Sequence, residues 1–521
     1  MSLASGLPET HQLRPSTPCR ATHQDGREWV VCQQVGEHVL GFAFPATQPL
    51  GSNDAEQGIA RMEAAPASAL TLGAPLSWPE SDPLLRALTR QRAREHAALA
   101  SQARAPFVPG QSKIPPSGKV VGEPEVENLI EASLDLWLTA GRFSDQFEAA
   151  IARTFGATRA IAVNSGSSAN LVALSTLTSP QLGTRALQPG DEVITAAAGF
   201  PTTVNPILQN GLVPVFVDSD LATGNIDPAL IEVAISPRTK AIMAAHTLGN
   251  PMDMREIMRI ARKHGLWVVE DCCDAFGSTL DGQLCGTFGD IGTLSFYPAH
   301  HITMGEGGAV FSRDPLLMKI AESFRDWGRD CYCPPGKDNT CGKRFCWKLG
   351  QLPEGYDHKY TYSHAGYNLK ITDMQAAVGL AQLQRLDGFI ARRRANHAAL
   401  ALALRAHSAD QHLLLPEVLP GADPSWFGFL MVLKPDAPCT RNALTAYLEQ
   451  QGIGTRLLFA GNLTRQPYFA TQPHRVASPL TQADTLMEQA FWIGIWPGIE
   501  SAQIDYMART IAAYLGTAWN D

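Results

Sequence analysis

No stretch of the sequence reaches eighteen consecutive apolar residues, and its first twenty residues lack the basic region and apolar core of a secretion signal. We therefore expect a cytoplasmic protein without a membrane-spanning helix. The chain also lacks an excess of basic residues, because 42 Lys and Arg stand against 50 Asp and Glu. A formal charge of -8 provides no electrostatic footprint for nucleic acid or for an anionic membrane surface.

Disulfides are not expected either. Ten cysteines occur in a chain without a secretion signal, and the cytosol keeps such thiols reduced or bound to metal. The composition shows no bias toward disorder, since 45% of the 521 residues are hydrophobic and 18% are charged. A chain of this length has room for two or three domains with buried cores.

Three regions follow one another along the chain. Residues 1–79 are rich in Ala, Pro, Ser, Thr and Gly and predict a poorly ordered extension, in which residues 29–44 fit a hairpin. Residues 80–400 alternate short β-branched runs with helix-length segments, which predicts a large α/β domain with a mostly parallel sheet and helices on both faces. It includes a helix at 82–105 and a cysteine-containing insertion at about 331–350. Residues 401–521 predict a smaller α/β domain, joined to the large one by a single long helix from Ile371 to Ala406.

Two motifs in the large domain suit a phosphorylated ring cofactor. The turn Ser-Gly-Ser-Ser-Ala-Asn at 165–170 follows an apolar strand and opens a helix, so its N–H groups could cradle a phosphate. Glu270 and Asp271 end another apolar strand, where a carboxylate can keep a pyridine nitrogen protonated. Ordinary helix capping is the alternative interpretation of both motifs.

Taken in order with Gly-Phe-Pro at 199–201, Ser-Phe-Tyr-Pro at 295–298 and Gly-Tyr-Asn at 366–368, these motifs resemble the sugar aminotransferases. That family consists of fold-type I pyridoxal-phosphate enzymes, and the resemblance covers roughly residues 105–521. It implies that Gly166, Ser167 and Ser295 hold the cofactor phosphate. It further implies that Phe200 stacks on the ring, that Asp271 pairs with the ring nitrogen, and that Asn368 reaches the phosphate of a neighbouring subunit in a homodimer.

The chain departs from the aminotransferases at one chemically decisive position. Their Schiff-base lysine lies five residues after the serine of Ser-Phe-Phe-Pro-Thr-Lys, and here that position is His300. Because an imidazole cannot form this covalent link, we expect a non-covalently held pyridoxamine phosphate, with His300 as general base. Asp274 also stands where the family usually has Gln. The alternative is that His300 is a structural histidine in an inactive aminotransferase.

The second departure is a set of cysteines. Fifty-seven residues separate Cys273 from Cys331, and Cys333 and Cys341 follow closely. Four thiolates suit a [2Fe-2S] cluster, and this spacing resembles that of the iron-sulfur sugar 3-dehydrases. A structural zinc site is the alternative, and Cys272 or Cys346 could compete as ligands. The remaining cysteines are interpreted as small buried apolar residues; they are Cys19, Cys32, Cys285 and Cys439.

The resemblance implies reductive removal of the 3-hydroxyl group from a nucleotide-linked 4-keto-6-deoxyhexose, with CDP as the expected nucleotide. Electrons would arrive singly through the cluster from an NADH-dependent flavin reductase, in a lipopolysaccharide pathway. Lys343 and Arg344 suit docking of such a reductase or an ordinary solvated surface, and Arg456 or Arg465 could pair with the substrate diphosphate. The alternatives are a pyridoxal-phosphate-dependent nucleotide-sugar aminotransferase and a non-catalytic iron-sulfur or zinc sensor.

Overall fold

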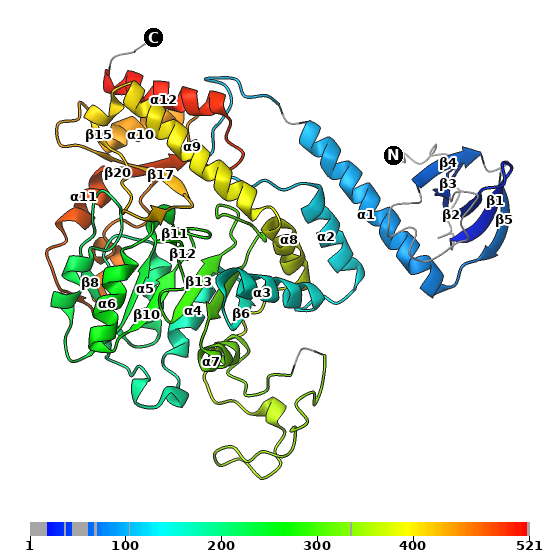
Figure 1. The fold of residues 1–521 in the computed structure, drawn as a ribbon, viewed down its shortest axis with the longest axis horizontal. Coiled ribbons are helices and arrows are strands. Elements are labelled where there is room, and N and C mark those ends of the chain that lie inside the picture. The colour runs from blue at the N-terminus through cyan, green and yellow to red at the C-terminus, as the bar shows by residue number, and fades with distance from the viewer. Residues whose placement is uncertain are drawn as a thin grey trace, which may run out of the picture. The chain divides into compact units, whose positions relative to one another are not determined.

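The computed structural model describes residues 18–35, 38–43, 61–66, 70–103, 105–333 and 336–517. The chain forms two compact units (Figure 1). The first comprises Met1–Ala103 with Ser133–Asp135, and the second comprises Arg104–Ala132 with Leu136–Asp521. Among the described residues, no helix combines the length and apolar character needed to span a bilayer.

The first unit contains a five-stranded antiparallel sheet and one long helix, α1 (Trp78–Gln102). The strands, in the order β4-β3-β2-β1-β5, are β1 (Cys19–His23), β2 (Glu28–Val35), β3 (His38–Ala43), β4 (Arg61–Pro66) and β5 (Leu70–Pro75). Trp29 and Val31 of β2 are buried in one small apolar cluster. Val30 of the same strand packs with Leu84 of α1 in another. Strand alternation therefore supplies two apolar faces. The described part of residues 1–79 forms this sheet where a poorly ordered extension was expected, and the antiparallel pair of β2 and β3 agrees with the hairpin expected at 29–44.

The second unit is built on an eight-stranded sheet with the order β19-β8-β7-β9-β10-β13-β14-β6. Its strands are β6 (Arg159–Val163), β7 (Glu192–Ala196), β8 (Val213–Val217), β9 (Thr239–Ala245), β10 (Trp267–Asp271), β13 (Ile291–Ser295), β14 (Gly308–Ser312) and β19 (Arg475–Val476). The strands from β19 to β13 are parallel, and β14 is antiparallel to both of its neighbours. The mostly parallel sheet predicted from the sequence is confirmed. The carboxyl ends of β6, β10 and β13 consequently meet at one edge, where ligands bind in such sheets.

Helices cover both faces of this sheet. On β7, Val193 belongs to an apolar cluster that includes residues of α4 (Gly166–Thr176), α5 (Pro201–Gln209) and α7 (Pro315–Arg325). The next residue, Ile194, belongs to a different cluster that contains residues of α6 (Met254–His264). Two further helices, α2 (Glu123–Leu134) and α3 (Arg142–Phe155), precede β6. Because both faces are buried, the strands show continuous apolar runs in the sequence.

The connection to the C-terminal part consists of two helices rather than the single long one expected from Ile371 to Ala406. Helix α8 (Asp373–Leu383) ends before Gln384, and α9 (Leu386–Ala406) follows directly. The apolar spacing continues through the break, which is why periodicity did not reveal it. Buried Asp373 begins α8 and accepts hydrogen bonds from the backbone of the turn that opens α3.

The C-terminal part carries a four-stranded antiparallel sheet and three helices. The sheet order is β15-β17-β20-β18, from β15 (Leu413–Leu414), β17 (Gly428–Leu433), β18 (Thr455–Leu457) and β20 (Ala490–Gly494). The helices are α10 (Arg441–Gln450), α11 (Thr481–Gln489) and α12 (Ser501–Leu515). A small sheet of β11 (Thr279–Leu280), β12 (Gln283–Leu284) and β16 (Ala422–Asp423) links this part to the large sheet. Both parts therefore belong to one compact unit.

Between α7 and α8 the chain makes a long irregular excursion. Isolated bridges between Asp326 and Asn368 and between Arg329 and Tyr362 close its base. We call residues 329–362 the cysteine loop, since Cys331, Cys333 and Cys341 lie within it. In Figure 1 this loop extends past α7 and away from the large sheet.

Candidate active site

The turn after β6 forms a cradle at the start of α4. Ser165 caps the helix, because its hydroxyl accepts a backbone N–H three residues later at 3.0 Å. A Cβ placed on Gly166 would lie 2.4 Å from Cβ of Ser295 and 2.9 Å from Sγ of Cys273. The fold thus brings together three sequence-predicted residues from three different elements, and Ser167 is exposed at the same turn. Free N–H groups at a helix N-terminus attract anions, so the cradle fits a phosphate group.

The cradle allows a prediction about cofactor affinity. In Gly166→Ala, the added methyl group must displace Ser295 or Cys273, so we expect the dissociation constant of pyridoxamine phosphate to rise about tenfold or more, a change of ~1.4 kcal/mol. Fluorescence titration of the purified protein with the cofactor measures this. Gly388→Ala on α9 is the matched control, because a Cβ there meets nothing within 4 Å. Equal affinities for the two variants would contradict the cradle.

Asp271, at the end of β10, is held by hydrogen bonds from three sides. The Nδ2 of Asn170 and the hydroxyl of Thr203 each donate to its Oδ2 at 2.7 Å. The backbone N–H of Cys273 donates to Oδ1 at 3.1 Å. Thr293 in turn donates to Oδ1 of Asn170 at 2.7 Å. This buried carboxylate is therefore fixed in orientation, as the partner of a pyridinium nitrogen must be.

The supporting residues of Asp271 were missed by sequence reasoning. Asn170 ends the Ser-Gly-Ser-Ser-Ala-Asn motif, but the motif by itself assigns no role to it. Its position one turn into α4 was the sequence feature that could have indicated a role beside the cofactor. Thr203 and Thr293 carried no signal of their own, because threonine in a helix start or a buried strand is common.

His300 lies beside a second carboxylate, that of the half-buried Asp274. Its Nδ1 is 3.4 Å from Oδ1 of Asp274, which is within ion-pair range, and forms no hydrogen bond to a described residue. Burial raises the pKa of Asp274, and the charges of both His300 and Asp271 act on the same group. Asp274 is therefore coupled electrostatically both to the imidazole and to Asp271, the carboxylate that is predicted to bind the cofactor ring. The side chain of His300 is 14% exposed, so it remains partly accessible.

The backbone at His300 is anchored by a buried arginine. Nη2 of Arg393 donates to the carbonyl of His300 at 3.0 Å, and its Nη1 donates to the carbonyls of Trp426 and Phe427, each at 3.1 Å. The Phe427 ring lies 5.1 Å from the imidazole, centroid to centroid. Arg393 is 1% exposed, and sequence reasoning missed it because α9 reads there as an amphipathic helix. It positions His300, the predicted general base.

Phe200 occupies an open position at the start of α5. It is 49% exposed, and its ring meets Phe459 edge-on at 5.7 Å. The preceding residue, Gly199, accepts a hydrogen bond from the backbone of Ala460 at 3.2 Å. A ring held at one edge with a free face suits stacking on a cofactor, as the sequence analysis expects.

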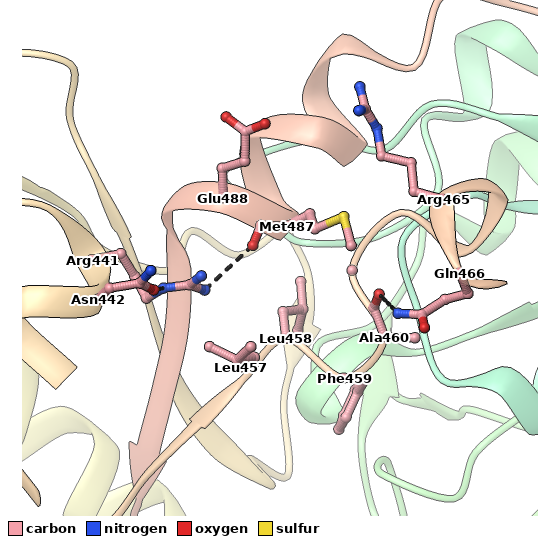
Figure 2. A pocket seen from close by; sticks show the side chains of 11 residues that line it. Arg441, Asn442, Leu457, Leu458, Phe459, Ala460, Arg465, Gln466, Met487 and Glu488 are labelled. Atoms are coloured by element: carbon pink, nitrogen blue, oxygen red, sulfur yellow. Dashed lines mark hydrogen bonds between the residues drawn. The ribbon is translucent and has the colours of Figure 1, made fainter. Parts of the chain in front are cut away.

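Phe459 also lines a cavity of about 570 Å³ beside α10 and α11 (Figure 2). Arg441 projects into it, donating to the carbonyls of Met487 and Ala490 at 3.3 and 3.0 Å, and burial lowers its pKa. Arg465 is engaged with Asp484 through two hydrogen bonds. The expected substrate contact Arg456 is exposed and is not among the cavity-lining residues.

Asn368 does not join the other predicted cofactor contacts within this chain. It pairs with Asp326 at the base of the excursion, and its Oδ1 accepts a hydrogen bond from Lys370 at 2.8 Å. The next residue, Leu369, accepts the backbone N–H of Asn164 at 2.9 Å, which places the segment at the edge strand β6. A contact from Asn368 to the phosphate of another subunit stays a prediction.

Three of the four predicted cluster cysteines lie together in the cysteine loop. Cys333 interacts with the thiols of both Cys331 and Cys341. Burial opposes ionisation of Cys333, but hydrogen bonds from Thr340 and Cys341 outweigh it and lower the pKa to about 7. Cys341 Sγ also accepts the backbone N–H of Lys343 at 3.4 Å. A polar, partly exposed group of thiols is the setting in which cysteines bind metal.

The fourth predicted ligand, Cys273, lies in the cofactor cradle instead. Burial raises the pKa of its thiol well above the usual range, and the neighbouring charge of Asp271 adds to the effect. Cys346 is exposed. The two basic residues of the loop differ in their surroundings. Arg344 donates a hydrogen bond to Asp357 at 2.7 Å, whereas Lys343 is exposed.

Cys272 belongs to a buried group with His246 and Glu270, whose donor atoms all lie within 4.8 Å of one another. Glu270 already accepts three backbone N–H groups at 2.6 to 2.8 Å. Nδ1 of His246 accepts the N–H of Met252 at 3.0 Å, so its Nε2 must carry the proton and donate to Glu270. The group is a satisfied hydrogen-bond network beneath Asp271 rather than a metal site.

Known proteins resemble this chain in sequence and in structure. The chain is 60% identical over 411 residues to the lipopolysaccharide biosynthesis protein RfbH of Salmonella typhimurium, which covers 79% of this chain and 94% of that protein. It is 55% identical over 409 residues to the dTDP-4-dehydro-2,6-dideoxy-D-glucose 3-dehydratase of Saccharopolyspora spinosa, covering 78% and 88%. A solved structure of the E coli GDP-4-keto-6-deoxy-D-mannose-3-dehydratase with bound hydrated PLP matches with a TM-score of 0.69 and 28% identity, covering 77% of this chain and 99% of that one.

Residues 120–512 match the model of the DegT/DnrJ/EryC1/StrS aminotransferase family. The fold-type I architecture expected from the sequence is thereby confirmed. With its cradle at α4, its carboxylate at the end of β10 and its sheet order, the chain belongs to the DegT/DnrJ/EryC1/StrS aminotransferase family.

Proposed function

We propose that this protein is a CDP-4-keto-6-deoxyglucose 3-dehydrase, which removes the 3-hydroxyl group of a nucleotide-linked 4-keto-6-deoxyhexose. The observation that carries the proposal is the side chain at position 300. An imidazole beside Asp274 stands at the position of the family's covalent lysine, in a chain whose Gly166 and Asp271 support the predicted contacts to the cofactor. A transaminase needs the amine at that position, whereas an elimination needs a base.

The residues fit pyridoxamine phosphate. When bound, this cofactor supplies a primary amine that condenses with the sugar ketone and a ring that accepts electron density. Gly166, Ser167 and Ser295 would hold its phosphate, and Phe200 would cover one face of its ring. Asp271 would keep the ring nitrogen protonated, aided by its fixed hydrogen bonds.

His300 would act as the general base and acid of the elimination. Its position is fixed by Arg393 through the backbone and by Asp274 through the ring. An imidazole is suited to take up a proton beside the cofactor and to deliver one to the departing hydroxyl group at neutral pH.

The substrate assignment draws on the relatives and on the cavity of Figure 2. The relatives include 3-dehydratases of dTDP- and GDP-linked sugars. The cavity of about 570 Å³ adjoins Phe459, which contacts the ring-stacking residue Phe200. We assign it to the nucleotide diphosphate, with the cationic Arg441 as its contact, and we assign CDP as the nucleotide. The pathway is 3,6-dideoxysugar and O-antigen synthesis in the cytoplasm.

The proposal includes a [2Fe-2S] cluster on the predicted cysteines, supplied with electrons by an NADH-dependent flavin reductase. Within this chain the four cysteines do not converge on one centre, because Cys273 lies in the cradle and the other three lie in the cysteine loop.

A product assay tests the function. The purified protein is incubated with pyridoxamine phosphate, a flavin reductase, NADH and each of the CDP-, dTDP- and GDP-linked 4-keto-6-deoxyhexoses, and products are identified by mass spectrometry. We expect a product one oxygen atom lighter than the substrate, formed fastest from the CDP sugar. An amino sugar formed with glutamate as donor would instead establish the aminotransferase alternative.

A further inference from the structure

Cys273 and the three loop cysteines lie in different parts of the second unit. Sγ of Cys273 faces Gly166 in the cradle, and its backbone N–H binds Asp271. The cysteine loop starts beside the edge strand β6. This is shown by the hydrogen bond from Asn164 to Leu369 and by that from Arg325 to the carbonyl of Ala162.

Because β6 leads directly into the turn of Gly166, the base of the loop lies near the cradle, and the separation of the cysteines arises beyond that base. From its base the loop extends farther outward, past α7, and Figure 1 shows no return toward β10. Cysteines that share a [2Fe-2S] cluster must instead surround the same pair of iron atoms.

The cysteine loop exposes many aromatic side chains. Among its described residues, the exposed fractions reach 46% for Tyr332, 58% for Phe345 and 56% for Tyr360. Tyr356 and Tyr362 are exposed as well, at 43% and 49%. A group of this kind is unusual for a surface facing only water, and tyrosine and phenylalanine are enriched where proteins contact one another.

We propose that the cluster is completed between two copies of this chain, with Cys331, Cys333 and Cys341 from one subunit and Cys273 from the partner subunit. This inference rests on the proposed function. The aromatic surface of the loop then packs on the partner subunit near the mouth of its cofactor cradle. Each dimer holds two such clusters, and each cluster lies next to a cofactor site rather than at the end of a remote loop.

One arrangement within a single chain competes with this proposal. Nδ1 of His358 lies 3.9 Å from Sγ of Cys341, His358 is 1% exposed, and its Nε2 has no hydrogen-bond partner among the described residues. His358 could therefore supply a fourth ligand inside the loop. The two arrangements differ in whether Cys273 is needed and in whether it acts across the dimer.

Complementation between two defective subunits separates the arrangements. Chains carrying Cys273→Ser and Cys333→Ser are co-expressed with different affinity tags, and the mixed dimer is purified through both tags. One of its two shared sites then has all four cysteines, and the other lacks two. We expect about half of the wild-type iron and sulfide content and half of the visible absorbance in the mixed dimer, and neither variant alone should retain the cluster.

Three results would overturn the inference. They are a mixed dimer without iron, a Cys273→Ser homodimer that keeps its cluster while His358→Ala loses it, and a wild-type protein that carries the cluster as a monomer. Binding of pyridoxamine phosphate by each variant shows that it is folded. Iron in the wild-type protein without dehydration of any sugar would refute the proposed function and leave the shared cluster standing, so the two failures are distinguishable.

Discussion

His300→Asn lowers the rate of sugar dehydration by about 10²- to 10⁴-fold, which is the range expected when a general acid-base group is removed. Asparagine retains a similar size and a polar end, so the backbone anchor from Arg393 to the carbonyl of residue 300 is preserved. The variant should bind pyridoxamine phosphate nearly as well as the wild type, because none of the predicted phosphate contacts changes. Single-turnover consumption of the 4-keto sugar measures the effect.

Two further variants sharpen this prediction. His264→Asn on α6 is the control, since this histidine pairs with Glu232 away from the cradle, and its rate should match the wild type. His300→Lys should abolish dehydration and bind pyridoxal phosphate covalently, visible as a cofactor that dialysis does not remove. Dehydration retained in either His300 variant would refute the base assignment.

Asp271→Asn lowers the same rate by about 10²- to 10³-fold, the range found when one electrostatic contact to a developing charge is removed. The amide is neutral and cannot keep the ring nitrogen protonated, so the ring withdraws electron density less strongly. Asn170 and Thr203 can still donate to the amide oxygen, which limits damage to the fold. The rate is measured at saturating cofactor, so that weaker binding does not obscure the chemical step.

Asp387→Asn is the control for this change, because Asp387 is exposed on α9. Its rate and unfolding temperature should equal those of the wild type. The Asp271→Asn protein should unfold within a few degrees of both. A loss of less than about fivefold at saturating cofactor would contradict the proposed pairing with the ring nitrogen, because such a loss amounts to only ~1 kcal/mol.

The large sheet was predictable because each of its strands is buried on both faces and therefore appears as a short apolar run. The N-terminal sheet was predictable only in part. The apolar stretch at 29–44 indicated a hairpin, and β2 and β3 do pair antiparallel there, but the other three strands lie in a stretch rich in Ala and Pro that shows no periodicity. The break at Gln384 also escaped detection, because the apolar spacing of α8 and α9 remains in phase across it.

For the site, local motifs indicated the residues to which direct roles are proposed and missed those that hold them in position. Gly166, Ser295, Asp271 and His300 each stand in a recognisable sequence context. Arg393 does not, because its contact with the carbonyl of His300 joins residues far apart in the chain. The sequence indicated Asp274 only as a departure from the family, and the structure shows that it lies beside His300.

By itself, the sequence determined the α/β class, the imidazole at position 300 and the spacing of the cysteines, because these follow from local pattern and residue identity. Only the tertiary structure decided that Cys273 lies with Gly166 and Ser295 while the other three cysteines lie together on a distant loop. The physical reason is that strand order sets which distant residues meet. Neither periodicity nor spacing along a chain records the order in which its strands pair.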